Sequence, residues 1–514
     1  MLKFFFLKPV YLISLGAISA FSLPPYNFFI INFITFSLFF IFIFNKKKTF
    51  SNNRSFFKYG WFFGFGYFLS GLYWISISLT FDQTFKFLIP IATILLPACL
   101  GIFYGFITYL FSIFYSKKVV VSFLIFSILF GTIELVRGHI FTGFPWNLIA
   151  FSFAENVNFI HILSIVGTYS FNLICISLFT LPAVFILRKS RKEILVCCLF
   201  IIIAASFLIF GTIKNNQFVL LKEIKHDYTI RVVSPNISLD RFYSNQDELK
   251  IINEMIVLTN PQRNQSTIFL WPEGIIPDSY LNDMTTYKNL FSENFSKNHI
   301  IIMGLKSFKN INNKNLYFNS LAVFDNQLNL INSYNKVNLV PFGEFIPFKN
   351  FLGFVGLRTV TSDYKSFSSG SRRKSLNIKN DQFNLSLLPL ICYEIIYSGK
   401  LFKNQKFDYI INISEDGWFG KSIGPKQHLA HSIFRSIESG KYIIRSTNNG
   451  ISAIINPMGI IEKQVKFGDT GYIDFIESKS VKTTPFSKYG NIIFVSLILL
   501  YIFLIFSFNK INYE

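Results

Sequence analysis

The sequence predicts an α-helical membrane domain with many spans, joined to an α/β domain that lies outside the bilayer. Hydrophobic residues make up 51% of the 514 positions and the mean hydropathy is +0.42, which is more than a soluble domain needs to fill one core. Long apolar runs occupy residues 1–215, whereas residues 220–485 alternate short β-rich runs with polar connections. These two regions are therefore expected to be separate domains.

Eight apolar runs are long enough to cross a hydrocarbon layer of about 30 Å. Seven of them precede the polar region and one follows it, at residues 4–22, 28–44, 56–78, 87–115, 119–138, 158–187, 194–213 and 489–508. The sequence thus predicts a transmembrane domain of about seven spans over 1–215 and a C-terminal span over 489–508.

The loops between these runs alternate in charge. Basic residues gather at 46–54, 117–118 and 188–192, and the intervening loops are nearly free of them. Because Lys and Arg are retained on the cytoplasmic side, both termini are expected in the cytoplasm and residues 220–485 on the extracytoplasmic side. The net charge of +21 has the same explanation, so no nucleic-acid partner is predicted.

The polar region reads as a single α/β domain. Strands interleaved with helices favour a sheet whose central strands are continuous apolar runs. The expected strands cover 229–233, 266–271, 300–304, 321–324, 385–392, 409–414, 442–446 and 451–455, with helices at 245–258 and 428–440.

One cysteine differs from the other four. Cys392 lies in the polar region, while the others lie inside apolar runs, where cysteine commonly behaves as a small buried hydrophobe. A single cysteine cannot build a disulfide framework, and no Cys/His spacing suits zinc, so neither a metal nor a cofactor is predicted. Cys392 is either a structural thiol or a nucleophile.

Three motifs favour the nucleophile. Trp271-Pro272-Glu273, Tyr334-Asn335-Lys336 and Ile391-Cys392-Tyr393-Glu394 each stand at the end of a strand-like run, and strand ends are where α/β sheets place reacting groups. Cysteine acyl transfer needs a general base, a sulfur nucleophile and a positive charge at the oxyanion. Glu273, Cys392 and Lys336 offer these capabilities, although each taken singly could be structural.

Neighbouring residues are candidates for supporting roles. Glu344, eight positions after Lys336, is expected to orient it through a charge-assisted hydrogen bond. Tyr393 and Glu394 follow the nucleophile directly. Glu394 could equally be an acidic residue in the first turn of a helix that begins at Cys392, where the helix dipole favours negative charge.

These motifs resemble the Glu-Lys-Cys signature of the nitrilase, or carbon–nitrogen hydrolase, superfamily over residues 228–475. Further motifs at 413–420, 424–428 and 445–450, and membrane motifs at 23–27, 71–74, 134–138 and 143–147, resemble its apolipoprotein N-acyltransferase branch. The resemblance implies an α-β-β-α sandwich. Glu415 departs from the pattern, because the family usually has asparagine before Asp416.

The resemblance also implies the reaction. A phospholipid acyl donor would acylate Cys392, and the thioester would pass the chain to the N-terminal diacylglyceryl-cysteine of an apolipoprotein, in the last step of lipoprotein maturation at the bacterial inner membrane. Trp418 and Phe419 would then contact the acyl chain, or else be core aromatics. An apolar segment over 345–357 is expected to dip into the outer leaflet.

The residues taken without the resemblance are also compatible with two other functions. A membrane-bound amidase could use the same three groups, with water discharging the thioester. A transporter with an outer binding domain is also possible, although the spans contain few charges that would mark a substrate path.

Overall fold

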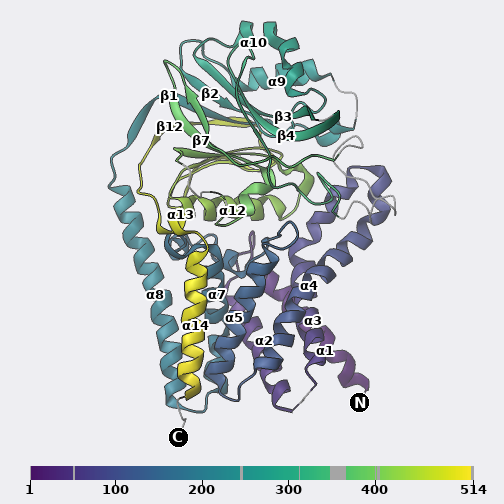
Figure 1. The fold of residues 1–514 in the computed structure, drawn as a ribbon, viewed down its shortest axis with the longest axis vertical. Helices are drawn as coiled ribbons and strands as arrows, with labels where there is room; N and C mark the ends of the chain where they lie inside the picture. The colour runs from purple at the N-terminus through teal and green to yellow at the C-terminus, as the bar shows by residue number, and fades with distance from the viewer. Residues whose placement is uncertain are drawn as a thin grey trace.

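The computed structural model describes residues 2–49, 52–243, 247–311, 313–347, 366–399, 401 and 406–510. A bundle of long helices forms one end of the molecule and an α/β domain is stacked on it (Figure 1). The chain termini both lie at the end of the bundle that is farthest from the α/β domain (Figure 1). The predicted fold class is confirmed.

Every predicted apolar run contains a helix. The long helices are α1 (Leu2–Ser19), α2 (Ile30–Thr49), α3 (Arg54–Leu72), α4 (Ile89–Phe114), α5 (Val119–Arg137), α7 (Leu163–Leu187), α8 (Arg191–Val219) and α14 (Ile492–Lys510). Seven helices of the described chain, all of these except α1, are long and apolar enough to cross a membrane. The short helix α6 (Val157–Ile160) precedes α7, so that run is divided in two.

A buried ion pair shapes the loop after α5. Arg137 Nε donates to Glu134 Oε2 at 2.8 Å, and Tyr104 donates to Glu134 Oε1 at 2.7 Å. Arg137 also donates to the carbonyl of Trp146 at 3.0 Å. Charges are energetically costly inside a membrane unless they are paired. Because Arg137 is held by Glu134 and donates to the Trp146 carbonyl, the pair fixes the conformation of the 138–147 loop.

The α/β domain contains two six-stranded sheets, ordered β12-β1-β2-β3-β4-β5 and β11-β10-β9-β8-β7-β6. Their strands are β1 (Ile224–Ser234), β2 (Thr267–Leu270), β3 (His299–Ile311), β4 (Lys314–Phe324), β5 (Leu330–Asn335), β6 (Leu376–Lys379), β7 (Asn384–Ile391), β8 (Tyr409–Glu415), β9 (Ile443–Asn448), β10 (Ser452–Ile455), β11 (Ile461–Val465) and β12 (Gly471–Ser478). The eight predicted strands are all present; β5, β6, β11 and β12 were not predicted.

Helices cover the outer faces of both sheets. Helices α9 (Glu248–Thr259) and α10 (Lys288–Asn294) lie on the side away from the bundle, and α12 (Gly424–Ser439) lies between the second sheet and the bundle (Figure 1). The short α13 (Pro485–Tyr489) leads into α14. The layers therefore form the α-β-β-α sandwich implied by the resemblance.

One glutamine joins α12 to the membrane domain. Gln427 Oε1 accepts hydrogen bonds from the indoles of Trp146 at 2.9 Å and Trp74 at 3.1 Å. Its amide donates to the carbonyls of Pro24 at 3.3 Å and Gly71 at 3.4 Å. A polar side chain with all these partners is fully satisfied although buried, so α12 is fixed in place on the bundle.

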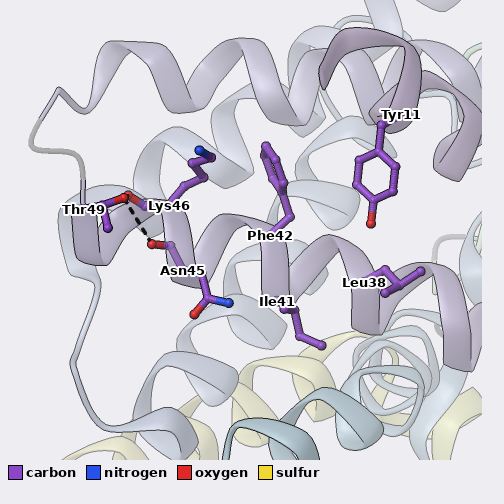
Figure 2. A pocket seen from close by; sticks show the side chains of 7 residues that line it. All are labelled: Tyr11, Leu38, Ile41, Phe42, Asn45, Lys46 and Thr49. Atoms are coloured by element: carbon purple, nitrogen blue, oxygen red, sulfur yellow. Dashed lines mark hydrogen bonds between the residues drawn. The ribbon is translucent and has the colours of Figure 1, made fainter. Parts of the chain in front are cut away.

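A surface groove of about 480 Å³ lies between α1 and α2, lined by Tyr11, Leu38, Ile41, Phe42, Asn45, Lys46 and Thr49 (Figure 2). Most of its lining residues belong to the C-terminal half of α2, and that end of α2 lies on the side of the bundle away from the α/β domain (Figure 1). None of the candidate catalytic residues lines it, so it is separate from the candidate active site.

Candidate active site

Glu273 lies three residues beyond the end of β2, where the chain leaves the sheet. Its Oε2 accepts a hydrogen bond from the backbone N–H of Glu415 at 3.0 Å. Its Oε1 accepts one from the amide of Asn319 at 2.7 Å. The carboxylate is thus held from both sides, and the residue is only 8% exposed.

Lys336 directly follows β5 and is 1% exposed. Its Nζ donates to Glu344 Oε1 at 2.9 Å and lies 3.5 Å from Glu273 Oε1. Burial acts to lower the pKa of Lys336, but the carboxylates of Glu273 and Glu344 outweigh burial and hold that pKa above its usual value. Lys336 is therefore a fixed positive charge between two carboxylates.

Cys392 follows β7 and begins a five-residue 3₁₀ helix, η8 (Cys392–Ile396), in agreement with the helix expected to start there. Its φ of 48° is in the left-handed region, which a non-glycine residue adopts only when its surroundings enforce it. Burial and then Glu273 raise the pKa of the thiol, while Lys336 opposes them. The resting sulfur is a protonated thiol, so it needs a base.

Glu394 connects the turn that carries Cys392 to Val337 and Asn338, the residues that follow Lys336. Burial acts to raise its pKa, but Arg373 and the N–H of Ile391 lead a set of partners that lowers it. The fully buried, ionised side chain is the acidic residue in the first turn of η8, as expected, and it also accepts hydrogen bonds from more distant donors. Its donors are the backbone N–H groups of Ile391 at 2.9 Å, Val337 at 2.9 Å and Asn338 at 3.1 Å, the hydroxyl of Tyr334 at 2.7 Å and Arg373 at 2.7 Å.

Tyr393 contacts the membrane domain. Its hydroxyl donates to the carbonyl of Gly143 at 2.9 Å, and its ring stacks near Phe144 with centroids 6.5 Å apart. Tyr397 donates to the same carbonyl at 3.2 Å. The turn that carries Cys392 is therefore anchored to the loop that the Glu134–Arg137 pair braces.

Trp418 and Phe419 lie on the same side of the sandwich but have different neighbours. The Trp418 ring lies 5.3 Å from Phe242 and 5.9 Å from Phe81. Phe419 packs 4.8 Å from Trp74, within the contact between the two domains. The apolar segment 345–357, which is expected to enter the leaflet, lies outside the described residues from position 348 onward.

A polar network behind the nucleophile was not predicted from the sequence. His428 Nε2 lies 3.3 Å from the Cys392 carbonyl and its Nδ1 lies 2.9 Å from Asp416 Oδ1. Arg445 donates to Asp416 Oδ2 at 2.8 Å. Burial acts to raise the pKa of Asp416, but Arg445 and His428 hold it at about 2.

This network predicts an acid-labile contribution to stability. Because the pKa of Asp416 falls from 3.8 to about 2 on folding, the ionised form contributes about 2 kcal/mol above pH 4, lost as the pH falls toward 2. We expect the melting-temperature advantage of the wild type over Asp416→Asn to shrink across this window. Asp469→Asn, at an exposed position, should parallel the wild type; a constant Asp416→Asn difference from pH 5 to 2 would contradict the assignment.

Two further residues of the site were missed by sequence reasoning. Asn319, on β4, donates 2.7 Å hydrogen bonds to both Glu273 and Glu344, and Arg373 pairs with Glu394. Asn319 is one of many asparagines and Arg373 belongs to a basic stretch, so neither had a distinctive signal. Among the described residues, no three His, Cys, Asp or Glu side chains group as metal ligands.

Comparison with known proteins covers both domains. Residues 15–181 match the family model of the apolipoprotein N-acyltransferase N-terminal domain, and residues 229–474 match that of carbon-nitrogen hydrolase. An amidase of the nitrilase superfamily from Nesterenkonia superposes on 51% of this chain and 94% of its own, with a TM-score of 0.34 and 9% identity.

Full-length relatives are similar along nearly the whole chain. The apolipoprotein N-acyltransferase of Rickettsia typhi is 33% identical over 94% of this chain and 96% of its own length. That of Rhizobium rhizogenes is 30% identical over 91% and 90%. With seven membrane-capable helices among its described residues, the protein is a multi-pass inner-membrane acyltransferase, and the chain belongs to the apolipoprotein N-acyltransferase family.

Proposed function

We propose that this enzyme moves an acyl chain from a phospholipid to the α-amino group of the diacylglyceryl-cysteine at an apolipoprotein N-terminus. The observation that supports it best is the buried array of Glu273, Lys336 and Glu344 beside Cys392, which is the one cysteine of residues 220–485. Glu273 is the base, Cys392 the nucleophile and Lys336 the oxyanion-stabilising cation.

In the first half-reaction, Glu273 removes the Cys392 proton as sulfur attacks the phospholipid ester carbonyl. Among the described contacts, Lys336 directs two of its three N–H donors at carboxylates. The third donor, with backbone N–H groups, stabilises the tetrahedral oxyanion. The carbon–oxygen bond of the ester then breaks, and protonated Glu273 returns the proton to the departing lysophospholipid alkoxide.

In the second half-reaction, the neutral α-amine of the apolipoprotein attacks the thioester carbonyl. Glu273 accepts the proton of the attacking nitrogen, the carbon–sulfur bond breaks, and the sulfur is reprotonated. One amide forms and one thioester is consumed, so no redox partner or metal is required.

The α/β domain is proposed to face the periplasm, with both termini in the cytoplasm. The basic loops support this orientation, because Lys118 of one such loop donates to the Asn509 carbonyl near the C-terminus at 2.5 Å. Basic residues and the C-terminus thus share one end of the bundle, as cytoplasmic retention of Lys and Arg requires. Substrates that reside in the outer leaflet would then reach Cys392 from the bilayer.

The proposal is tested by incubating the detergent-solubilised enzyme with phospholipid and measuring its intact mass. We expect one added acyl chain on Cys392, removable by hydroxylamine, and rapid discharge by a diacylated lipopeptide with a free α-amine. The same lipopeptide with an acetylated amine is the matched control and should leave the adduct intact. Equally fast discharge by water alone would identify an amidase, and absence of any adduct would contradict acyl transfer.

A further inference from the structure

A further buried ion pair contacts the segment that carries Glu273. Arg241, in the 3₁₀ helix η5 (Leu239–Phe242), pairs with Glu415, the last residue of β8, and their side chains are 0% and 2% exposed. The Glu415 carboxylate also accepts from Asn448 Nδ2 at 2.7 Å and from the N–H of Gly417 at 2.8 Å. The Glu415 carboxylate is therefore held by residues of three other elements, η5, β9 and the 3₁₀ helix η9 (Asp416–Phe419).

The pair touches the Glu273 segment at two points. The backbone N–H of Glu415 donates to Glu273 Oε2 at 3.0 Å, and Arg241 Nε donates to the carbonyl of Gly274 at 3.1 Å. Gly274 has a φ of 63°, so the chain turns sharply just after Glu273 and the guanidinium holds that turn. The ion pair thus fixes both the carboxylate and the backbone that carries it.

We propose that Arg241 and Glu415 are positioning residues that aim the Glu273 carboxylate at Cys392. The inference rests on the proposed role of Glu273 as general base. General-base catalysis depends on placing the base within hydrogen-bond reach of the proton, and small displacements of a positioned group cost large factors in rate.

Because Arg241 and Glu415 are both buried, each of the two charges needs the other as its counter-ion. Desolvation raises the pKa of Glu415, and Arg241 leads the partners that oppose it. Without Arg241 the carboxylate would be buried without its counter-ion, a state that is relieved by protonation or by movement. Either response is expected to shift the backbone at Glu415, whose N–H donates a hydrogen bond to the Glu273 carboxylate.

Arg241 also connects the base to the aromatic side of the site. Its guanidinium lies 4.5 Å from the Phe242 ring, which packs 5.3 Å from Trp418. A cation over an aromatic face is attractive. Loss of Arg241 is therefore expected to disturb more of the site than loss of the Glu415 charge.

The test measures two quantities for Glu415→Gln, Arg241→Met and the double variant: the first-order rate of acyl-adduct formation at saturating phospholipid, and the melting temperature. We expect each single variant to lose at least tenfold in rate at an unchanged half-saturating phospholipid concentration. The double variant should recover part of the loss, because it contains no unpaired charge. Arg241→Lys keeps the charge but not the Nε donor, and its acylation rate should lie between that of the wild type and that of Arg241→Met. It replaces Arg241→Met in the test if that variant does not fold.

The matched control is the ion pair of Arg231 and Asp474, which joins β1 to β12 with contacts of 2.8 Å and does not touch the site. Arg231→Met with Asp474→Asn should lower the melting temperature and keep the acylation rate within twofold. Normal rates in folded Glu415→Gln and Arg241→Lys would overturn the inference. Glu273→Gln separates the two proposals: if it acylates normally the proposed function fails, whereas if it alone is inactive only the positioning role fails.

Discussion

Replacing Cys392 by alanine is expected to lower N-acylation by about 10⁴-fold or more, because the thioester can no longer form and no other route transfers the chain covalently. The protein should remain folded, since Cys392 is a small buried side chain whose turn is held by Glu394 and Tyr393 through hydrogen bonds outside the thiol. The measurements are the rate of lipopeptide N-acylation and the intact mass after incubation with phospholipid.

Controls for this variant come from the chain itself. Cys198→Ala removes an exposed thiol on α8 and should keep both the rate and the adduct. Cys392→Ser retains the geometry with a much weaker nucleophile and should be slower than the wild type by several orders of magnitude. Acylation by Cys392→Ala at the wild-type rate would rule out the thioester mechanism.

Lys336→Met is expected to lower the rate of acyl-adduct formation by about 10³-fold, in the range seen when one oxyanion donor is lost. It should also destabilise the protein by about 3–5 kcal/mol, because Glu273 and Glu344 stay buried without their shared cation. At present the Oε1 atom of each carboxylate accepts hydrogen bonds from both Lys336 and Asn319. Without the lysine, each Oε1 atom would keep only the bond from Asn319. Adduct kinetics and the melting temperature measure the two effects.

A second variant separates these effects. Lys336→Met combined with Glu344→Gln removes one of the two carboxylates, so it should regain much of the lost melting temperature without regaining the rate. Recovery of both quantities together would assign Lys336 a purely structural role.

The fold could be predicted well where the sequence has strong periodic signals. Each membrane helix is a long apolar run, and the strands β2 and β7 are largely apolar because central strands are covered on both faces. The strands that were missed lie toward the sheet edges. In β11, for example, Glu462, Lys463 and Gln464 are exposed, so its composition is that of a polar loop.

The site could be predicted only in part. Glu273, Lys336 and Cys392 each belong to a local motif at a strand end, and a short stretch of sequence is enough to detect them. Asn319 and His428 contact the site only because separate elements converge in three dimensions. Glu394 shows the same limit, since its neighbours in sequence do not reveal the loop of Val337 and Asn338 that it holds.

The docking of α12 has a consequence for engineering. Its Gln427 and His431 are held by tryptophans and phenylalanines of the membrane bundle, with His431 4.8 Å from Trp146 and 4.3 Å from Phe151. A truncated fragment of residues 220–485 would leave this face, which also includes Phe434 packed 4.4 Å from Phe151, uncovered in water, where exposed aromatic patches promote aggregation. Solubility tags would not replace the missing surface. The catalytic half is thus not a portable module, and chimaeras with soluble hydrolases would need a redesigned α12.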